Sequence, residues 1–155
     1  MEDRPISASE ASCALCAATG GDLIWEDALC RVVLAGEPDG SVFPGYCRVV
    51  WNRHVREMSD LPAPERRHLM SVVFASEAAL RQVAAPDKIN LASLGNVVAH
   101  LHWHVIPRWL DDSHYPAPIW AAARRSSRPR RSITGLELRA ALIEALGEEQ
   151  GGGLS

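Results

Sequence analysis

Three histidines stand at alternate positions in the segment His100-Leu101-His102-Trp103-His104. If this segment is a β-strand, the three imidazoles share one face, and Leu101 and Trp103 share the other. A single histidine is common in a protein core, but three on one strand face are costly to explain as packing. Imidazole that is neutral near pH 7 can bind a metal, or attack phosphorus without a separate strong base. The segment therefore predicts either a metal site or a nucleophile whose neighbours position a charged substrate.

A second group of candidate ligands is the pair Cys13-x-x-Cys16. In a cytoplasmic chain of this size, such a pair is more typical of metal binding or redox chemistry than of a structural disulfide. Zinc prefers four tetrahedral nitrogen or sulfur ligands, and His54 and His100 are the natural partners for a closed Cys₂His₂ set. The alternative is that both cysteines are free thiols and that His100 only contacts a ligand.

The composition is typical of one ordinary globular domain. The 155 residues include 16 basic and 19 acidic side chains, for a net charge of −3, and 47% of the residues are hydrophobic. This supplies enough apolar material for one core and argues against wholesale disorder or a dedicated nucleic-acid coat protein. The chain shows neither a run of about 20 apolar residues nor a secretory signal pattern. We therefore expect a cytoplasmic protein with no membrane partner and no nucleic-acid partner.

The elements that must position these residues follow from hydrophobic periodicity. Short strands are predicted within 25–34, over 46–51, over 88–92 and over 100–106, the last one stopped by a proline. One long helix is predicted from Glu65 to about Ala84, because apolar residues recur there at helical spacing. Strands followed by a long helix and further strands indicate an α+β fold with an antiparallel sheet.

The C-terminal part of the sequence has a different character. Residues 111–133 lack periodicity and contain a cluster of arginines between 124 and 131, which we interpret as a solvated, flexible arm. Thr134 and Glu137 then fit a capping box, which predicts a short helix that stops at Gly147. The predicted organisation is a flexible N-terminus over 1–12, one domain over 13–120, and a basic linker with a short helix over 121–155.

The stretch NLASLGNVVAHLHWHVIPR, residues 90–108, resembles the signature of the histidine triad (HIT) family, His-x-His-x-His followed by apolar residues. The similarity extends upstream through residues 48–55 to the cysteine pair, covers roughly 13–120, and is similar to the bacterial diadenosine-tetraphosphate-hydrolase-like branch. The resemblance implies a HIT-like α+β fold that binds nucleotides, usually as a homodimer with a sheet shared across the interface.

The resemblance also implies roles for individual residues. His102 would be the nucleophile on an α-phosphate, with its other ring nitrogen held by a nearby backbone carbonyl. His104 and Asn90 would contact the phosphate, and Asn96 would contact the phosphate or the leaving group. Asp39 or Glu37 would bind the ribose. Trp120 would lie near the site of the dimer partner.

For the metal, the resemblance implies a structural zinc held by Cys13, Cys16, His54 and His100. The implied reaction is a double displacement in which a nucleotidyl-histidine forms and is then resolved by water. Dinucleoside polyphosphates, nucleoside phosphoramidates and nucleotidyl sulfates are the expected substrates. Two alternatives stay open: a hydrolase in which the His-x-His pair holds a catalytic zinc, and a non-enzymatic nucleotide sensor.

Overall fold

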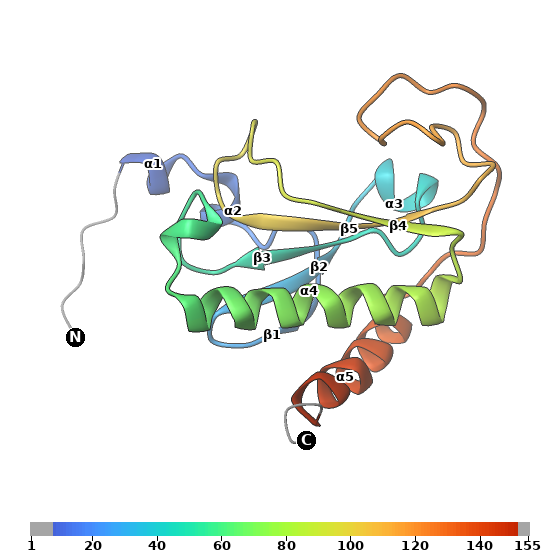
Figure 1. The fold of residues 1–155 in the computed structure, drawn as a ribbon. Coiled ribbons are helices and arrows are strands. Elements are labelled where there is room, and N and C mark those ends of the chain that lie inside the picture. Colours follow the sequence, from blue (N-terminus) through green and yellow to red (C-terminus); the bar gives the residue numbers. More distant parts are fainter. Residues whose placement is uncertain (1–7, 152–155) are drawn as a thin grey trace.

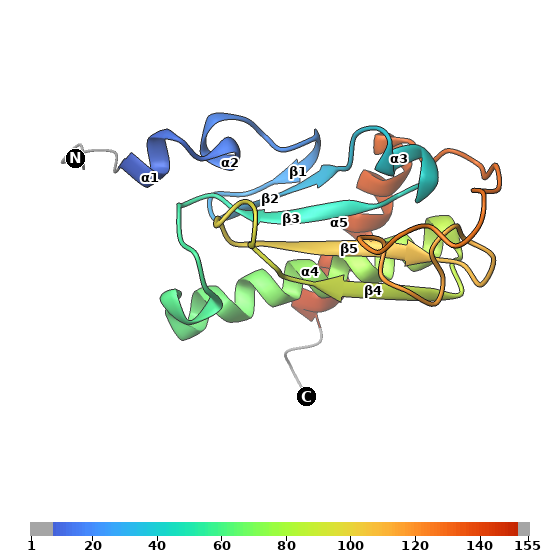
Figure 2. The same cartoon turned by 90° about the horizontal axis from the view of Figure 1, so that it is seen from above.

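A computed structural model describes residues 8–151 of the chain. Its centre is a five-stranded sheet in which every neighbouring pair is antiparallel, in the order β1-β2-β3-β5-β4. Seen from above, the strands lie side by side in this order (Figure 2). The strands are β1 (Asp22–Glu26), β2 (Cys30–Leu34), β3 (Cys47–Trp51), β4 (Lys88–Ala92) and β5 (His102–Arg108). The predicted α+β class with an antiparallel sheet is confirmed.

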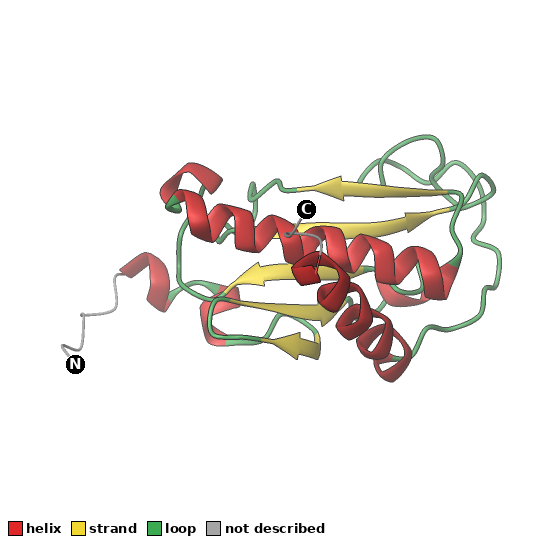
Figure 3. Ribbon diagram, turned by 60° about the horizontal axis from the view of Figure 1, so that its bottom comes forward, coloured by secondary structure: helices red, strands yellow, loops and turns green. Residues whose placement is uncertain are grey.

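Two helices cover one face of this sheet (Figure 3). Helix α4 (Ala63–Ala84) is the predicted long helix, and α5 (Gly135–Gly151) crosses beside it. Leu69, Leu80 and Leu142 of these helices are fully buried in one cluster with Val49 and Val105 of the sheet. Burial of each such side chain contributes about 1.5–3 kcal/mol, so this layer is the main source of stability.

Period-two alternation places the histidines on the opposite face. Residues 47, 49 and 51 of β3 belong to the cluster under the helices, whereas Arg48 and Val50 point the other way. Because Arg48 pairs with His104 and Val50 pairs with His102 in the antiparallel register, these four side chains share the sheet face opposite α4 and α5. Trp103 lies on the helix side, half-buried against the core, as predicted.

The N-terminal segment is tied to the end of the sheet by Arg31. Helices α1 (Ala8–Ala11) and α2 (Ala14–Ala17) lie at this end (Figure 1). The buried Arg31 guanidinium donates to the carbonyl oxygens of Leu15, Ala18 and Thr19. The predicted flexible N-terminus over 1–12 lies mostly outside the described residues, and within it 8–11 form the single turn of α1.

The loop after β5 is held by a buried ion pair. Asp112 accepts two hydrogen bonds from Arg108 and three more from the backbone N–H groups of residues 109, 114 and 115. Arg125 donates to the carbonyl oxygens of Asp112 and Tyr115, and Arg130 lies over the Trp109 ring. The interpretation of the arginine cluster as a free arm is therefore wrong for these two side chains, which bind the loop back to the protein.

Two predicted boundaries differ from the structure. The histidine strand begins at His102 and continues through Pro107 to Arg108. Pro107 is tolerated because the pairing with β3 ends at Val105, so no partner on that side needs its missing N–H. Helix α5 begins with the predicted Thr134–Glu137 capping box but passes through Gly147, since a glycine within an exposed helix costs only about 1 kcal/mol.

Two further short helical turns complete the described part of the fold: α3 (Asp39–Val42) in the loop between β2 and β3, and the 3₁₀ turn η1 (Met58–Asp60) before α4. Within residues 8–151, every helix is too short or too polar to cross a membrane.

Candidate functional site

His102 is held by the backbone of its own segment. Its Nδ1 lies 2.6 Å from the carbonyl oxygen of His100. A carbonyl oxygen can only accept, so Nδ1 carries the ring proton and Nε2 carries the lone pair. This is the backbone carbonyl that the family resemblance led us to expect. The ring is thus fixed in the tautomer that leaves the Nε2 lone pair free.

His104 lies in a less polar environment beside His102, with the two ring centroids 4.9 Å apart. Its Nδ1 lies 2.6 Å from the hydroxyl oxygen of Tyr46, which immediately precedes β3. Burial, reinforced by the nearby His102 and the Arg48 cation, lowers the pKa of His104 to about 3. His104 is therefore a neutral hydrogen-bonding group at any ordinary pH.

Both histidines line a cavity of about 660 Å³ on the sheet face opposite α4 and α5. This volume suits a nucleotide-sized ligand, and most of the other lining residues are apolar. Asn96, in the loop between β4 and β5, forms part of the wall, as does Trp120, whose ring centroid lies 5.0 Å from that of His104. Four of the six predicted catalytic and substrate residues therefore line this one cavity: His102, His104, Asn96 and Trp120.

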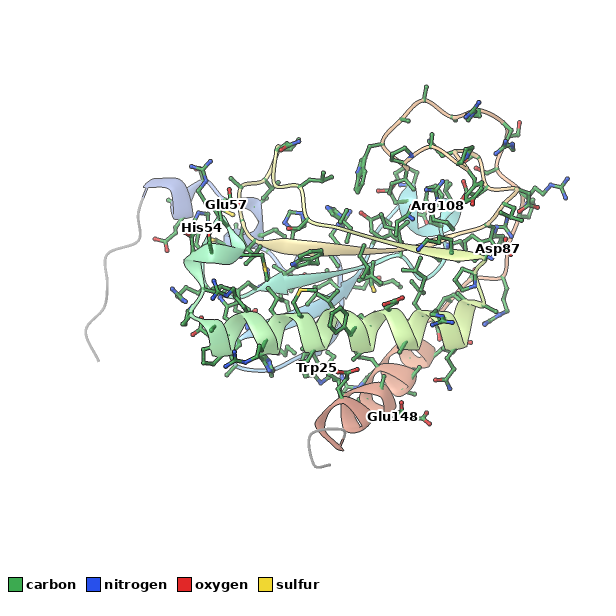
Figure 4. All side chains as sticks on the ribbon, in the orientation of Figure 1. Trp25, His54, Glu57, Asp87, Arg108 and Glu148 are labelled. Atoms are coloured by element: carbon green, nitrogen blue, oxygen red, sulfur yellow. The ribbon has the colours of Figure 1, made fainter. Side chains whose placement is uncertain are left out.

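The other two predicted substrate residues lie farther out. Asn90 is on the edge strand β4, and its side-chain oxygen accepts a hydrogen bond from Arg108. Arg108 lies at the end of the molecule opposite His54 (Figure 4). Asp39 begins α3, and its carboxylate lies 4.0 Å from the guanidinium of Arg48. Neither Asn90 nor Asp39 lines the cavity, and their substrate roles stay predictions.

The second site is a cluster of two cysteines and two histidines. Cys13, Cys16, His54 and His100 offer ligand atoms that all lie within 4.8 Å of one another. Nδ1 of His100 is 3.4 Å from both sulfur atoms, and Nδ1 of His54 is 3.3 Å from the sulfur of Cys16. Tetrahedral zinc, with bonds of about 2.3 Å to sulfur and 2.0–2.1 Å to nitrogen, requires sulfur–nitrogen separations near 3.5 Å. The donor set and its geometry therefore fit zinc.

The ring of His100 is already oriented for a metal. Its Nε2 donates to the carbonyl oxygen of Trp51 at 2.6 Å, which leaves the lone pair on Nδ1 facing the sulfur atoms. Burial lowers the pKa of His100, which favours the neutral form that metal binding needs. Because the His100 carbonyl holds His102, one residue belongs to both sites.

Sequence reasoning missed two residues of the cavity region, Tyr46 and Arg48. Both lie in the segment that leads into β3, more than fifty residues from the histidines. The alternation of side chains along the strand could have identified them. Residues 46 and 48 share the face of Val50, and the observed strand pairing places Val50 opposite His102. Outside the cavity region, His68 Nε2 lies 2.6 Å from a carboxylate oxygen of Asp27, and its side chain is 34% exposed.

Comparison with known proteins identifies the class. Residues 19–110, more than half of the chain, match the HIT domain family, so the chain belongs to that family. A histidine triad protein from Sinorhizobium meliloti has 26% identity and a TM-score of 0.64, covering 82% of this chain and 90% of its own. One from Marinobacter aquaeolei has 28% identity and a TM-score of 0.62, with the same coverage.

Two further relatives are informative. A zinc-bound histidine triad family protein from Mycobacterium smegmatis shares the fold at 22% identity, with a TM-score of 0.57 and coverage of 92% of this chain and 98% of its own. An AP-4-A phosphorylase from Mycobacterium tuberculosis is 32% identical over 78 residues, which are 46% of this chain and 40% of that protein. The chain thus spans less than half the length of the curated relative it matches.

Proposed function

We propose that the protein is a nucleotide hydrolase or transferase that cleaves at the α-phosphate of dinucleoside polyphosphates or nucleoside phosphoramidates. The observation that carries this proposal is the hydrogen bond from His102 Nδ1 to the His100 carbonyl at the edge of a nucleotide-sized cavity. Membership of the HIT domain family and the similarity to an AP-4-A phosphorylase support it.

In the first step, the lone pair on His102 Nε2 attacks the α-phosphorus. An N–P bond forms, and the bond from phosphorus to the leaving group breaks with its electron pair. A polyphosphate oxygen leaves as an anion, and a leaving nitrogen takes a proton from water and departs as an amine. The imidazole ring becomes cationic, and the His100 carbonyl dipole stabilises the Nδ1 proton. Water, or another nucleophile in a transferase reaction, then attacks the phosphorus. The N–P bond breaks, the proton of the water is released, and His102 is regenerated.

His104 and Asn96 are proposed to stabilise the negative charge that develops on the phosphate oxygens. Burial raises the pKa of Tyr46, so its hydroxyl stays protonated and donates to His104 Nδ1. The ring proton of His104 is then on Nε2, where it can be donated to a phosphate oxygen. Asn96 and Trp120 lie in the wall of the same cavity. There Asn96 contacts the phosphate or the leaving group, and Trp120 contacts the nucleoside.

The test of the proposed function is a hydrolysis screen with wild type and His102→Ala. Wild type is expected to release nucleoside monophosphate, and the variant is expected to lose at least about 1,000-fold in kcat/KM while it still binds nucleotide. His68→Ala is the matched control, because His68 is on α4 behind the sheet and its loss should leave kcat unchanged. Full activity in His102→Ala would overturn the proposal.

We further propose that the Cys₂His₂ cluster holds a structural zinc. Four protein ligands close a tetrahedral shell, so the metal fixes the N-terminal segment and His100 without activating water. The zinc-bound relative from M. smegmatis supports this proposal. The ion would act on catalysis only by holding the residue whose carbonyl orients His102.

Metal analysis should find one zinc per chain in wild type and substantially less in Cys16→Ser. Chelation is expected to lower Tm, and activity should fall only as the structure loosens. Immediate loss of activity in a protein whose Tm is unchanged would instead favour the catalytic-zinc alternative. Cys47→Ser is a control for the loss of a thiol, because Cys47 is buried in β3 away from the cluster.

For its assembly and location, we propose a cytoplasmic homodimer that binds small-molecule nucleotides. Light scattering should give twice the chain mass of 16.9 kDa. A monomeric mass at micromolar concentration would contradict the dimer without affecting the proposed reaction.

A further inference from the structure

The four cysteines differ in whether a dissolved oxidant can reach them. Cys30 and Cys47 lie on β2 and β3, fully buried in the cluster under the helices. Cys16 is exposed and lines a groove of about 1,120 Å³ at the end of the sheet, whereas Cys13 is buried beside it. Oxidation of cysteine follows its exposure and its thiolate character, so Cys16 is the thiol that an oxidant meets first.

The spacing of Cys13 and Cys16 allows them to bond to each other. Cys13 is the N-cap of the single turn α2 and Cys16 is its third residue, and the Cys16 N–H donates to the Cys13 carbonyl oxygen at 3.2 Å. Their sulfur atoms lie within 4.8 Å of each other. A disulfide requires a separation of about 2.05 Å. Movement within one short turn is enough to close this gap.

The same two sulfur atoms contact the residue that orients His102. Each lies 3.4 Å from His100 Nδ1, and the His100 carbonyl oxygen accepts the hydrogen bond from His102 Nδ1. His54, the fourth member of the cluster, lies beside the N-terminal turns (Figure 4). Metals bind the thiolate form of cysteine, so two sulfur atoms joined in a disulfide no longer serve as a pair of ligands. Oxidation of this pair would therefore remove half of the proposed zinc ligands and free the Nδ1 side of the His100 ring.

We infer that Cys16 is a site of modification by hydrogen peroxide, and that the disulfide it then forms with Cys13 releases zinc and lowers activity reversibly. This inference rests on the proposed structural zinc and adds a response to oxidants to the proposed function. It is carried by the exposure of Cys16, the nearness of Cys13 and the contact of both sulfur atoms with His100.

The oxidation consists of two balanced steps. The Cys16 thiolate attacks one oxygen of peroxide, so an S–O bond forms, the O–O bond breaks and hydroxide leaves. The Cys13 thiolate then attacks the Cys16 sulfur, so the S–S bond forms, the S–O bond breaks and a second hydroxide leaves. The two sulfur atoms lose two electrons in total, which reduce the peroxide, and the buffer protonates both hydroxides to water.

The test treats zinc-loaded wild type and Cys16→His with excess hydrogen peroxide, beside untreated samples. In wild type, a chromogenic chelator should detect the release of one zinc per chain, and peptide mass spectrometry should find a disulfide between residues 13 and 16. Tm should fall, kcat should fall by about tenfold or more, and a reductant with added zinc should restore both.

Two variants serve as controls. Histidine at position 16 keeps a zinc ligand but has no thiol, so Cys16→His should retain its zinc and its Tm in peroxide. Cys47→Ser keeps both thiols of the cluster and removes a buried one, so it should respond to peroxide as wild type does.

Wild type that keeps its zinc and forms no disulfide between residues 13 and 16 would overturn the inference, and so would equal zinc release from Cys16→His. A disulfide that leaves kcat and Tm unchanged would overturn the link to His102. If Cys16→His does not bind zinc, the mapped disulfide and its reversal by reductant in wild type decide.

The outcomes also separate this inference from the proposals on which it depends. If purified wild type holds no zinc, the structural-zinc proposal fails, and the inference fails with it. If untreated wild type cleaves no nucleotide, the proposed reaction fails and the claim of lowered activity fails with it, whereas zinc release and Tm still test the oxidation of the thiol pair.

Discussion

At the residue scale, the two histidines of the cavity have different hydrogen-bond partners. His102 donates from Nδ1 to a backbone carbonyl, whereas His104 accepts at Nδ1 from the Tyr46 hydroxyl in a buried environment that lowers its pKa to about 3. Under the proposed function, this difference separates the nucleophile, His102, from a neutral hydrogen-bond donor, His104. The imidazole of the nucleophile must become cationic during the reaction, whereas the imidazole of the donor must stay neutral.

The low pKa of His104 should make the protein sensitive to acid. Below the ordinary histidine pKa of about 6.5, the unfolded chain takes up a proton that the folded chain refuses until about pH 3. Stability contributed by this group is therefore complete above pH 6.5 and falls by up to about 1.4 kcal/mol per pH unit toward pH 4. In His104→Gln, urea denaturation between pH 7 and 4 should show a flatter dependence than in wild type. Parallel curves would contradict the assignment.

Sequence reasoning at this scale succeeded where the relevant partners are close in the chain. The alternation within 100–104 placed His102 and His104 on one face because strand geometry is local. It could not supply Tyr46 or Arg48, because their contacts depend on the register between β3 and β5, which the sequence alone does not fix.

At the element scale, the loop after β5 also depends on tertiary contacts that the sequence alone did not reveal. A stretch rich in proline and arginine suggested a flexible arm, but Asp112 is buried and bonded on all sides. Burial opposes ionisation of this carboxyl, yet Arg108 and three backbone N–H groups outweigh it and lower the pKa of Asp112 to about 2. Arg108 also donates to the carbonyl oxygen of Ala117, next to the cavity residues Pro118 and Trp120. The ion pair therefore anchors one wall of the cavity.

Replacing Asp112 by Asn should be costly. The amide would turn one acceptor into a donor among N–H groups and leave the Arg108 cation buried without its counter-ion. We expect a loss of about 3 kcal/mol in the free energy of unfolding at pH 7, measured in urea. Asp111→Asn is the neighbouring control: its carboxylate is 46% exposed, so this variant should unfold close to wild type. Similar values for the two variants would contradict the anchoring role.

At the scale of the whole molecule, α5 is part of the main core. It was predicted as a short helix after a linker, and its capping box was recognised because that signal spans only four residues. Where the helix lies required tertiary information. Leu138 and Leu142 enter the cluster beneath the sheet, and Arg139 donates to the carbonyl oxygen of Ile24 in β1. The HIT domain match ends at residue 110, yet the core continues into α5.

This packing predicts that the C-terminal helix is needed for stability. Leu142→Ala should lower the free energy of unfolding by about 2–5 kcal/mol, because the side chain is fully buried. Ile143→Ala, on the adjacent position that is 48% exposed, should cost less than about 1 kcal/mol. Thermal denaturation monitored by circular dichroism measures both. A Leu142→Ala variant as stable as wild type would show that α5 does not contribute to the core.

The central claim is that His102 becomes covalently attached to a nucleotide during turnover. Rapid quenching of wild type with diadenosine tetraphosphate, followed by peptide mass spectrometry, should find one adenylyl group on His102 that decays at the rate of product release. The account predicts this adduct in wild type and none in His102→Ala. Product formation without any adduct at His102, or with an adduct on another residue, would contradict it.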